Sequence, residues 1–317
     1  MRRILAGAVV LSTCLVALTA SVAHALVPIE PVITGKGEQY RGFANETYVV
    51  YTNWVRRTKT STAYARPLAG GPKQRLNAAG TGGNVGGIDP GTNTVILQQW
   101  NRRRSGIYFY DLDTDVRTKA AGVNSKKWEW NPLISSTFIV YALEHLRHGD
   151  WYTSLKVFRR DNSVTRALGT WRAGPNEMFP GSAGDRYVTY TVCNRRTCFA
   201  YLYDWETKTK QRIPTENRKA QYAPVIDESN STVYFTRSAP DRCGRGVNIW
   251  QRPIPLAGGD PVTKIVALPA GIDTGWESSL TANGGTGEMD LYIERWVCAN
   301  RTGDVYVARG VDTIPPT

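Results

Sequence analysis

The chain is poor in the residues that build metal centres and methionine-lined grooves. It contains three His and three Met among 317 residues, which leaves little material for a multi-histidine metal site or a Met-rich binding groove. It also has no Gly-x-Ser-x-Gly elbow, no zincin motif and no phosphate-binding Gly loop. We therefore expect neither a cofactor nor a resident metal.

Long hydrophobic runs are scarce too, and the clearest one is N-terminal. Arg2 and Arg3 precede an apolar stretch over residues 4–20, and Ala23-His24-Ala25 has the small-x-small pattern that signal peptidase cleaves. The stretch is short for a membrane span, and no later stretch is long enough. The sequence predicts a signal peptide over residues 1–25 and a mature chain of one domain over residues 26–317. We expect that chain to be secreted or extracytoplasmic and monomeric, without a membrane span.

The mature chain has four cysteines: Cys193, Cys198, Cys243 and Cys298. An even number in an exported protein indicates two disulfides, for which three pairings exist. Zinc is the alternative, but no Cys-x-x-Cys pair occurs and the two remaining histidines are distant in sequence.

Short β-branched and aromatic runs recur along the mature chain, with first residues 43 to 58 positions apart. This spacing suits four strands with their turns, the size of one propeller blade. A second strand-like run follows each first run, and no amphipathic helix of useful length separates them, which is typical of an all-β meander. The first runs are Thr47–Tyr51, Thr94–Gln98, Thr137–Tyr141, Arg186–Tyr190, Thr232–Thr236 and Asp290–Glu294.

One of these units resembles a known repeat. The segment Ala223–Ser238, followed by Val247–Trp250, is similar to the TolB-type propeller repeat, whose pattern is a Pro, a Ser-Pro-Asp-Gly turn, a hydrophobic strand and an Ile-Tyr strand. Ile88–Gly91 comes near the family's turn. The resemblance covers residues 40–310 and implies a six-bladed β-propeller of four-stranded antiparallel blades. It implies no activity, because such propellers serve binding, scaffolding and hydrolase gating alike.

The repeats predict blade units over residues 38–80, 81–124, 125–172, 173–216, 217–270 and 271–310. The last unit lacks an outer strand, because residues 311–317 are short and Pro-rich. An open ring would expose a blade edge. We predict that residues 29–34 supply the outer strand of the sixth blade and close the ring; the alternative is an unpaired N-terminal tail.

The second and third strands of every blade are joined by hairpins that must emerge on one face, and positive charge collects there. The six hairpin windows contain thirteen basic residues against Glu144, Asp150 and Asp241, whereas the rest of the mature chain is balanced. Such a face attracts polyanions over about 8 Å at physiological salt. The candidate binding residues are Arg56, Arg57, Arg102, Arg103, Arg104, Arg195, Arg196, Arg242 and Arg245.

Trp54, Trp100, Trp151 and Trp296 occur in the same hairpins and offer flat surfaces to sugar rings or to arginine. The candidate binding residues among them are Trp54, Trp100 and Trp151. We expect a non-enzymatic binding or scaffold protein that recognises an anionic glycan, an envelope polymer or an acidic protein. Export and the lack of a nucleic-acid module argue against nucleic acid. The alternative reading is that arginine only keeps exposed turns soluble.

The cysteines fall in these hairpins as well. Cys193 and Cys198 flank one hairpin tip, so we predict that they pair across it, and that Cys243 and Cys298 bridge the fifth and sixth blades. These bridges would make the arginine-bearing loops rigid and lower the entropy cost of binding, although stabilisation alone explains them equally well.

The alternative function is a glycoside-cleaving enzyme, a hydrolase or a lyase. Glu129, Glu177 and Glu277 stand near the start of innermost strands, where paired carboxylates could act on a glycosidic bond; the competing reading is structural. Separately, His145, His148 and Asp150 form the one histidine cluster and are weak candidates for a metal site.

Overall fold

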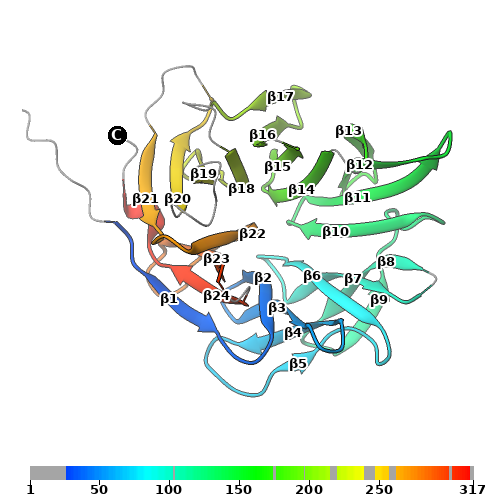
Figure 1. Cartoon of the computed structure of the whole chain (residues 1–317), viewed down its shortest axis with the longest axis horizontal. Coiled ribbons are helices and arrows are strands. Elements are labelled where there is room, and N and C mark those ends of the chain that lie inside the picture. Colours follow the sequence, from blue (N-terminus) through cyan, green and yellow to red (C-terminus); the bar gives the residue numbers. More distant parts are fainter. Residues whose placement is uncertain are drawn as a thin grey trace, which may run out of the picture.

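The computed structural model describes residues 26–102, 104–173, 176–195, 197–214, 220–238, 247–256, 262–299 and 302–314, without the side chains of residues 176, 238, 276 and 277. These residues form six four-stranded antiparallel sheets arranged around a common centre (Figure 1). The six-bladed β-propeller predicted from the repeats is therefore confirmed.

The first three blades follow one another along the chain. Blade one contains β2 (Glu38–Ala44), β3 (Tyr48–Val55), β4 (Thr60–Pro67) and β5 (Gln74–Arg75). Blade two contains β6 (Gly82–Ile88), β7 (Thr94–Trp100), β8 (Ser105–Asp111) and β9 (Val116–Lys119). Blade three contains β10 (Trp128–Ile134), β11 (Phe138–Arg147), β12 (Asp150–Arg159) and β13 (Thr165–Arg172).

The last three blades continue the ring. Blade four contains β14 (Asn176–Ala183), β15 (Tyr187–Asn194), β16 (Cys198–Asp204) and β17 (Thr209–Arg212). Blade five contains β18 (Ala220–Asp227), β19 (Thr232–Ser238), β20 (Val247–Pro253) and β21 (Thr263–Ala267). Blade six contains β22 (Ile272–Ala282), β23 (Met289–Val297), β24 (Thr302–Ala308) and the N-terminal β1 (Ile29–Ile33), and a short 3₁₀ helix follows at Val311–Thr313.

The ring closes through β1. This strand pairs antiparallel with β24, with Ile29 opposite Ala308 and Pro31 opposite Tyr306. Ile33 is 4% exposed and packs in a cluster with Val305 of β24. The prediction that the N-terminal segment forms the outer strand of the sixth blade is confirmed, and the alternative of an unpaired tail is wrong for this segment.

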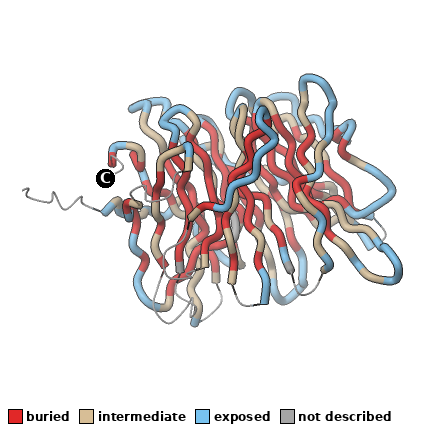
Figure 2. The backbone as a smooth tube through the Cα atoms, turned by 90° about the horizontal axis from the view of Figure 1, so that it is seen from above, coloured by how far each residue is buried: buried red, intermediate tan, exposed pale blue. Residues whose placement is uncertain are grey.

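The strands are buried at their centres because neighbouring sheets pack face to face. Val50, Leu97, Val140 and Val188 belong to one core cluster that runs through blades one to four. Figure 2 shows this buried layer between two exposed rims of turns. One rim carries the hairpins between the second and third strands of each blade, and we call it the hairpin face; the turns between first and second strands form the opposite face.

Each innermost strand bulges at a matching depth. The register of β2 shifts between Tyr40 and Phe43, and the register of β10 shifts between Trp130 and Leu133; the other four innermost strands shift likewise. Arg41 and Asn131 lie inside these bulges with φ of 55° and 46°. A bulge re-aims a side chain, and here it lets Arg41 of blade one donate a hydrogen bond to Asn131 of blade three.

Candidate functional site

A pocket of about 530 Å³ opens at the centre of the hairpin face. We call it the central pocket. Trp54 and Trp296 are the last residues but one of β3 and β23, just before the hairpins of blades one and six, and these two blades supply neighbouring walls of the pocket. The residues that line the pocket are Glu38, Tyr40, Arg41, Trp54, Asn84, Phe179, Asp273, Thr274, Gly275, Glu294 and Trp296.

Aromatic side chains give the pocket apolar walls. Four aromatic residues of the lining are half-buried, so part of each side chain is packed and part is accessible; they are Tyr40, Trp54, Phe179 and Trp296. The Tyr40 hydroxyl donates to Asn84 Oδ1 at 2.8 Å, and Ser61 Oγ lies 2.6 Å from the same oxygen. These bonds cross from blade one to blade two and fix the orientation of the Tyr40 ring.

Two carboxylates in the pocket are almost fully buried. Asp273 is 4% exposed, and its Oδ1 accepts hydrogen bonds from the Tyr222 hydroxyl at 2.5 Å and from the Thr274 N–H at 2.8 Å. Glu294 is 6% exposed and is packed against two glycines. A Cβ at Gly275 would lie 1.9 Å from Glu294 Oε2, and one at Gly303 would lie 2.7 Å from Oε1. The missing side chains of these glycines make the space for the carboxylate.

Two arginines with defined partners lie at the pocket. Arg56, on the hairpin of blade one, forms a 2.8 Å ion pair with Glu38. Arg41 is 6% exposed and donates to the Val85 carbonyl at 3.3 Å. The described lining residues thus include three carboxylates and one guanidinium, so the interior of the pocket is suited to an uncharged, hydrogen-bonding ring rather than to an acid group.

The predicted binding arginines that the structure describes are exposed, but they do not converge on one pocket. Arg56 and Arg57 lie in blade one, Arg102 and Arg104 in blade two, and Arg195 in blade four. The remaining candidates, Arg103, Arg196, Arg242 and Arg245, lie outside the described residues.

The predicted tryptophans reach three different places. Trp54 lines the central pocket, whereas Trp100 lines a second pocket on blade two. Trp151 is 51% exposed, in the hairpin of blade three beside the 60% exposed Leu146, which is its partner across the two strands. Trp296, which the sequence places in a hairpin but which was not among the predicted binding residues, lines the central pocket together with Trp54.

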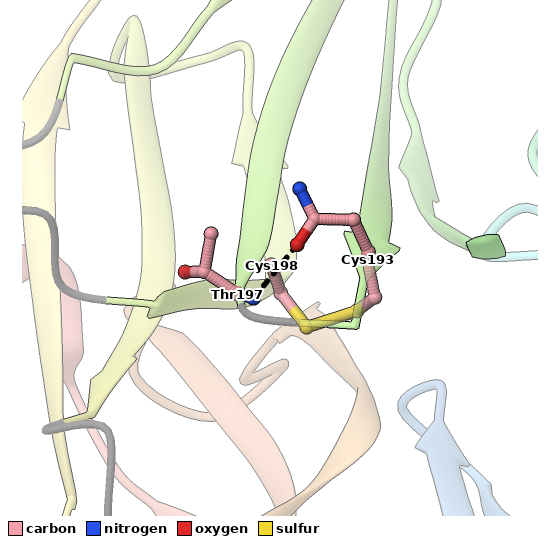
Figure 3. Close-up of a disulfide and its surroundings, with 4 residues drawn as sticks. Cys193, Thr197 and Cys198 are labelled. Carbon is pink, nitrogen blue, oxygen red and sulfur yellow. Dashed lines mark hydrogen bonds between the residues drawn. A yellow bond between two sulfur atoms is a disulfide. The ribbon is translucent and has the colours of Figure 1, made fainter. Parts of the chain in front are cut away.

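The disulfide between Cys193 and Cys198 is present, as predicted (Figure 3). The two residues are direct partners of β15 and β16, and inside their loop the Thr197 N–H donates to Asn194 Oδ1 at 2.9 Å. Cys298 is disulfide-bonded as well, while Cys243, its expected partner, lies outside the described residues. The Cys193–Cys198 bridge closes one hairpin of the hairpin face.

The glutamates proposed for catalysis do not line the central pocket within the described part of the chain. Glu129 is fully buried and accepts a 2.8 Å hydrogen bond from the Ser125 N–H, which agrees with the structural reading. Burial, together with the charge of Glu129, raises the pKa of the neighbouring Tyr141 to about 12. Glu177 is exposed on β14, and the side chain of Glu277 lies outside the description.

The histidine cluster occupies the long hairpin of blade three. The His145 ring stacks on Tyr152, with ring centroids 6.1 Å apart, and Asp150 forms a 2.6 Å ion pair with Arg172. His148 stands at the turn with φ of 50°. No group of three or more His, Cys, Asp or Glu side chains that could hold a metal occurs among the described residues.

Asp273 and Glu294 were missed by the sequence reasoning, although the repeats contain a signal for Glu294. The residue opposite the bulge is Tyr51 in blade one, Tyr141 in blade three and Phe235 in blade five, but Glu294 in blade six. The position is Thr189 in blade four, so it is aromatic in three of the other repeats and a carboxylate only in blade six; this departure marks Glu294 as functional or specially partnered.

A scan of protein families finds no match to this sequence, and a search of curated proteins finds none either. Solved structures do match. A putative TolB from Agrobacterium tumefaciens superposes with a TM-score of 0.57 at 13% identity, over 89% of this chain and 96% of that one. TolB from Acinetobacter baumannii gives a TM-score of 0.52 at 11% identity, over 83% of this chain and 63% of that one.

An enzyme has the same architecture. Oligogalacturonate lyase in complex with manganese gives a TM-score of 0.53 at 8% identity, over 90% of this chain and 98% of that one. At such identities the likeness speaks to the fold alone. Among the described residues, no helix combines the length and hydropathy needed to cross a bilayer. The chain therefore has the six-bladed propeller fold found in TolB-like proteins, with a central pocket that is both aromatic and acidic.

Proposed function

We propose that this protein is a non-enzymatic, extracytoplasmic carbohydrate-binding propeller that holds an anionic glycan on its hairpin face. The observation that carries the proposal is the central pocket, where Trp54 and Trp296 offer flat apolar surfaces beside Asn84, Asp273 and other hydrogen-bonding groups. Concave sites with aromatic walls and a few placed polar groups are typical of small-ligand recognition. A sugar ring needs both kinds of surface.

The anionic character of the ligand is supported by charge. The chain has a formal net charge of +12, and exposed arginines such as Arg57, Arg102 and Arg195 lie around the hairpin face. These charges would attract an acidic polymer. The acidic interior of the central pocket would then bind an uncharged, hydroxyl-bearing part of one of the sugar rings of that polymer. The disulfide at Cys193–Cys198 supports an oxidising, extracytoplasmic location.

Replacing Trp54 or Trp296 by Ala tests the proposal. Each change removes a large apolar wall, so we expect the Kd for a bound glycan, first identified on an array of acidic and neutral glycans, to rise about tenfold. Trp151→Ala is the matched control, because Trp151 is exposed and lies outside the pocket; it should change the Kd less than twofold. Equal effects of all three changes, or no glycan bound at any salt concentration, would contradict the proposal.

A second function, glycoside cleavage, has one observation in its favour. Asp273 and Glu294 are buried carboxylates that line the same pocket as Trp296, and glycosidases work with pairs of carboxylates. We expect no new chain ends when the bound glycan is incubated with the protein. Cleavage that is lost in Glu294→Gln while binding persists would instead establish an enzyme.

A further inference from the structure

Blade two contains a second pocket on the hairpin face, of about 480 Å³, and its lining is cationic. We call it the blade-two pocket. It lies between the β7–β8 hairpin and the segment that links β9 to β10. Arg104, Lys119, Lys126 and Lys127 line it, and no Asp or Glu is among its described lining residues. The other lining residues are Thr81, Gln99, Trp100, Asn101, Ser105, Gly106, Tyr108 and Ser125.

These four cations have no carboxylate partner within the part of the chain that the structure describes. Other arginines do have one: Arg56 pairs with Glu38, and Arg172 pairs with Asp150. Like charges that share a cavity repel one another, and a bound anion would relieve that repulsion. The pocket thus concentrates unneutralised positive charge at one place.

The walls of the blade-two pocket are fixed by a set of hydrogen bonds, most of them partly buried. Asn124 donates to the carbonyls of Ile107 and Ala120 at 2.8 and 2.6 Å, and its Oδ1 accepts from the Ile107 N–H at 2.8 Å. Glu129 Oε1 accepts from both the N–H and the hydroxyl of Ser125. Ser125 Oγ in turn accepts from the Lys127 N–H at 3.0 Å. Glu129 is thus a positioning residue for the loop that carries the lysines.

The hairpin side of the pocket is similarly ordered. Asn101 and Arg104 exchange hydrogen bonds, N–H to carbonyl at 2.9 Å and N–H to side-chain Oδ1 at 3.0 Å. The Trp100 indole packs against Gly82, where a Cβ would come within 2.3 Å of the ring. A flat aromatic face therefore stands beside the cationic groups, as in sites that bind a ring bearing an acid group.

The two pockets are neighbours along one strand. Asn84 of β6 lines the central pocket, and Gly82 of the same strand lies under Trp100. Two residues of a strand span about 7 Å, comparable with the length of a sugar unit. An extended chain can therefore place a ring in the central pocket and a neighbouring acid group in the blade-two pocket.

We propose that the blade-two pocket binds the oxyanion group of an acidic glycan, with Arg104, Lys119, Lys126 and Lys127 as its cationic contacts. The inference rests on the proposed function in taking a glycan as the carrier of the acid group. Carboxylate, sulfate and phosphate share the chemistry that these side chains recognise. Acidic polysaccharide is favoured over nucleic acid because a longer ligand would also reach the neighbouring central pocket, whose lining carries three carboxylates that would repel the regularly spaced phosphates of a nucleic acid.

Titrations with dextran sulfate, hyaluronate and uncharged dextran test this site and separate sulfate from carboxylate. For the acidic glycan that binds better, the double variant Lys126→Ala/Lys127→Ala should raise the Kd at least tenfold at low salt. It should also reduce the slope of log Kd against log salt by about two. Arg172→Ala, which removes a cation of the same face that is paired with Asp150, should change the Kd less than twofold.

Positioning by Glu129 is tested separately. Glu129→Ala should weaken acidic-glycan binding about as much as the lysine double variant, and Glu129→Gln should restore part of it, since an amide oxygen can still accept from Ser125. Equal effects of Arg172→Ala and of the lysine variant would overturn the site. So would tighter binding of a single-stranded oligonucleotide that the lysine variant abolishes. If the lysine variant raises the Kd but Trp54→Ala and Trp296→Ala leave it unchanged, the blade-two site is supported and the proposed carbohydrate site in the central pocket is contradicted.

Discussion

At the scale of single residues, specific neighbours determine the pKa or the position of several carboxylates in this protein. Arg186 holds Asp204 by two hydrogen bonds, Nε to Oδ1 at 3.0 Å and Nη2 to Oδ2 at 2.6 Å. The hydrogen bond from Arg186 is the largest cause that lowers the pKa of Asp204 from 3.8 to about 2. Asp273 likewise accepts a hydrogen bond from the Tyr222 hydroxyl, and Glu294 occupies the space left by two glycines. The environment of each of these three carboxylates therefore depends on a neighbouring residue that one substitution can remove.

Arg186→Gln should make the free energy of unfolding depend less on pH between pH 4 and pH 2. Because the folded pKa of Asp204 lies below its unfolded value, its contribution to stability is complete above about pH 4 and is lost as the pH falls towards 2. Without Arg186 the two values approach each other, so the decrease in unfolding free energy between pH 4 and pH 2 becomes smaller. Urea unfolding at pH 4, 3 and 2 measures this; a pH profile parallel to that of wild type would refute the assignment.

At the scale of elements, the turns of the opposite face connect neighbouring blades. The Glu228 carboxylate, just after β18, accepts hydrogen bonds from the backbone N–H groups of Asp185, Arg186 and Tyr187 in blade four. Asp185 in turn accepts from the hydroxyls of blade three, Ser136 at 2.8 Å and Thr137 at 2.7 Å. Blades three, four and five are thus tied to one another by side chains that satisfy the turn of blade four.

Glu228→Ala should lower the free energy of unfolding by about 2–3 kcal/mol, because it leaves three N–H groups of the blade-four turn without their charged acceptor. Glu228→Gln should cost less, since one oxygen remains. Glu206→Ala is the control for loss of an exposed carboxylate: its side chain is 64% exposed and forms a 3.3 Å ion pair with the Arg186 side chain. Chemical denaturation of the three variants gives the comparison, and equal values for Glu228→Ala and Glu206→Ala would contradict the turn's role.

At the scale of the whole molecule, closure of the ring depends on one short strand. β1 covers the outer edge of β24, and Glu30 adds a 3.0 Å ion pair with Arg309. Without β1, the edge of β24 would present unpaired N–H and C=O groups next to apolar side chains. The central and blade-two pockets lie on different blades of this ring, so their arrangement depends on its closure.

Deleting residues 26–34 should lower the Tm by several degrees and cause concentration-dependent association, because the exposed edge can pair with another chain. Glu30→Ala removes the ion pair but keeps the strand, so its Tm should stay within about one degree of wild type. Differential scanning calorimetry and light scattering measure both effects. An unchanged Tm and a monodisperse deletion variant would show that β1 does not close the ring.

The blade repeats, the closing strand and the bond between Cys193 and Cys198 were determined by the sequence alone. The repeats and the cysteine pair are local patterns, a strand period, a turn or a cysteine spacing, that keep their meaning without knowledge of distant residues. The closing strand follows from the missing outer strand of the last repeat. The ring therefore follows from repetition, as does the placing of Trp54 beside a hairpin.

Only the tertiary structure decided which side chains share a pocket. Whether Glu129 faces solvent or accepts from Ser125 depends on how β10 packs against blade two, where the Ser105 hydroxyl donates to the Glu129 carbonyl, and no sequence spacing reveals this packing. The meeting of Trp54 with Trp296 and of Arg104 with Lys126 requires segments brought together by the closed ring. Strand formation is encoded over a few residues, whereas a pocket is a product of long-range packing.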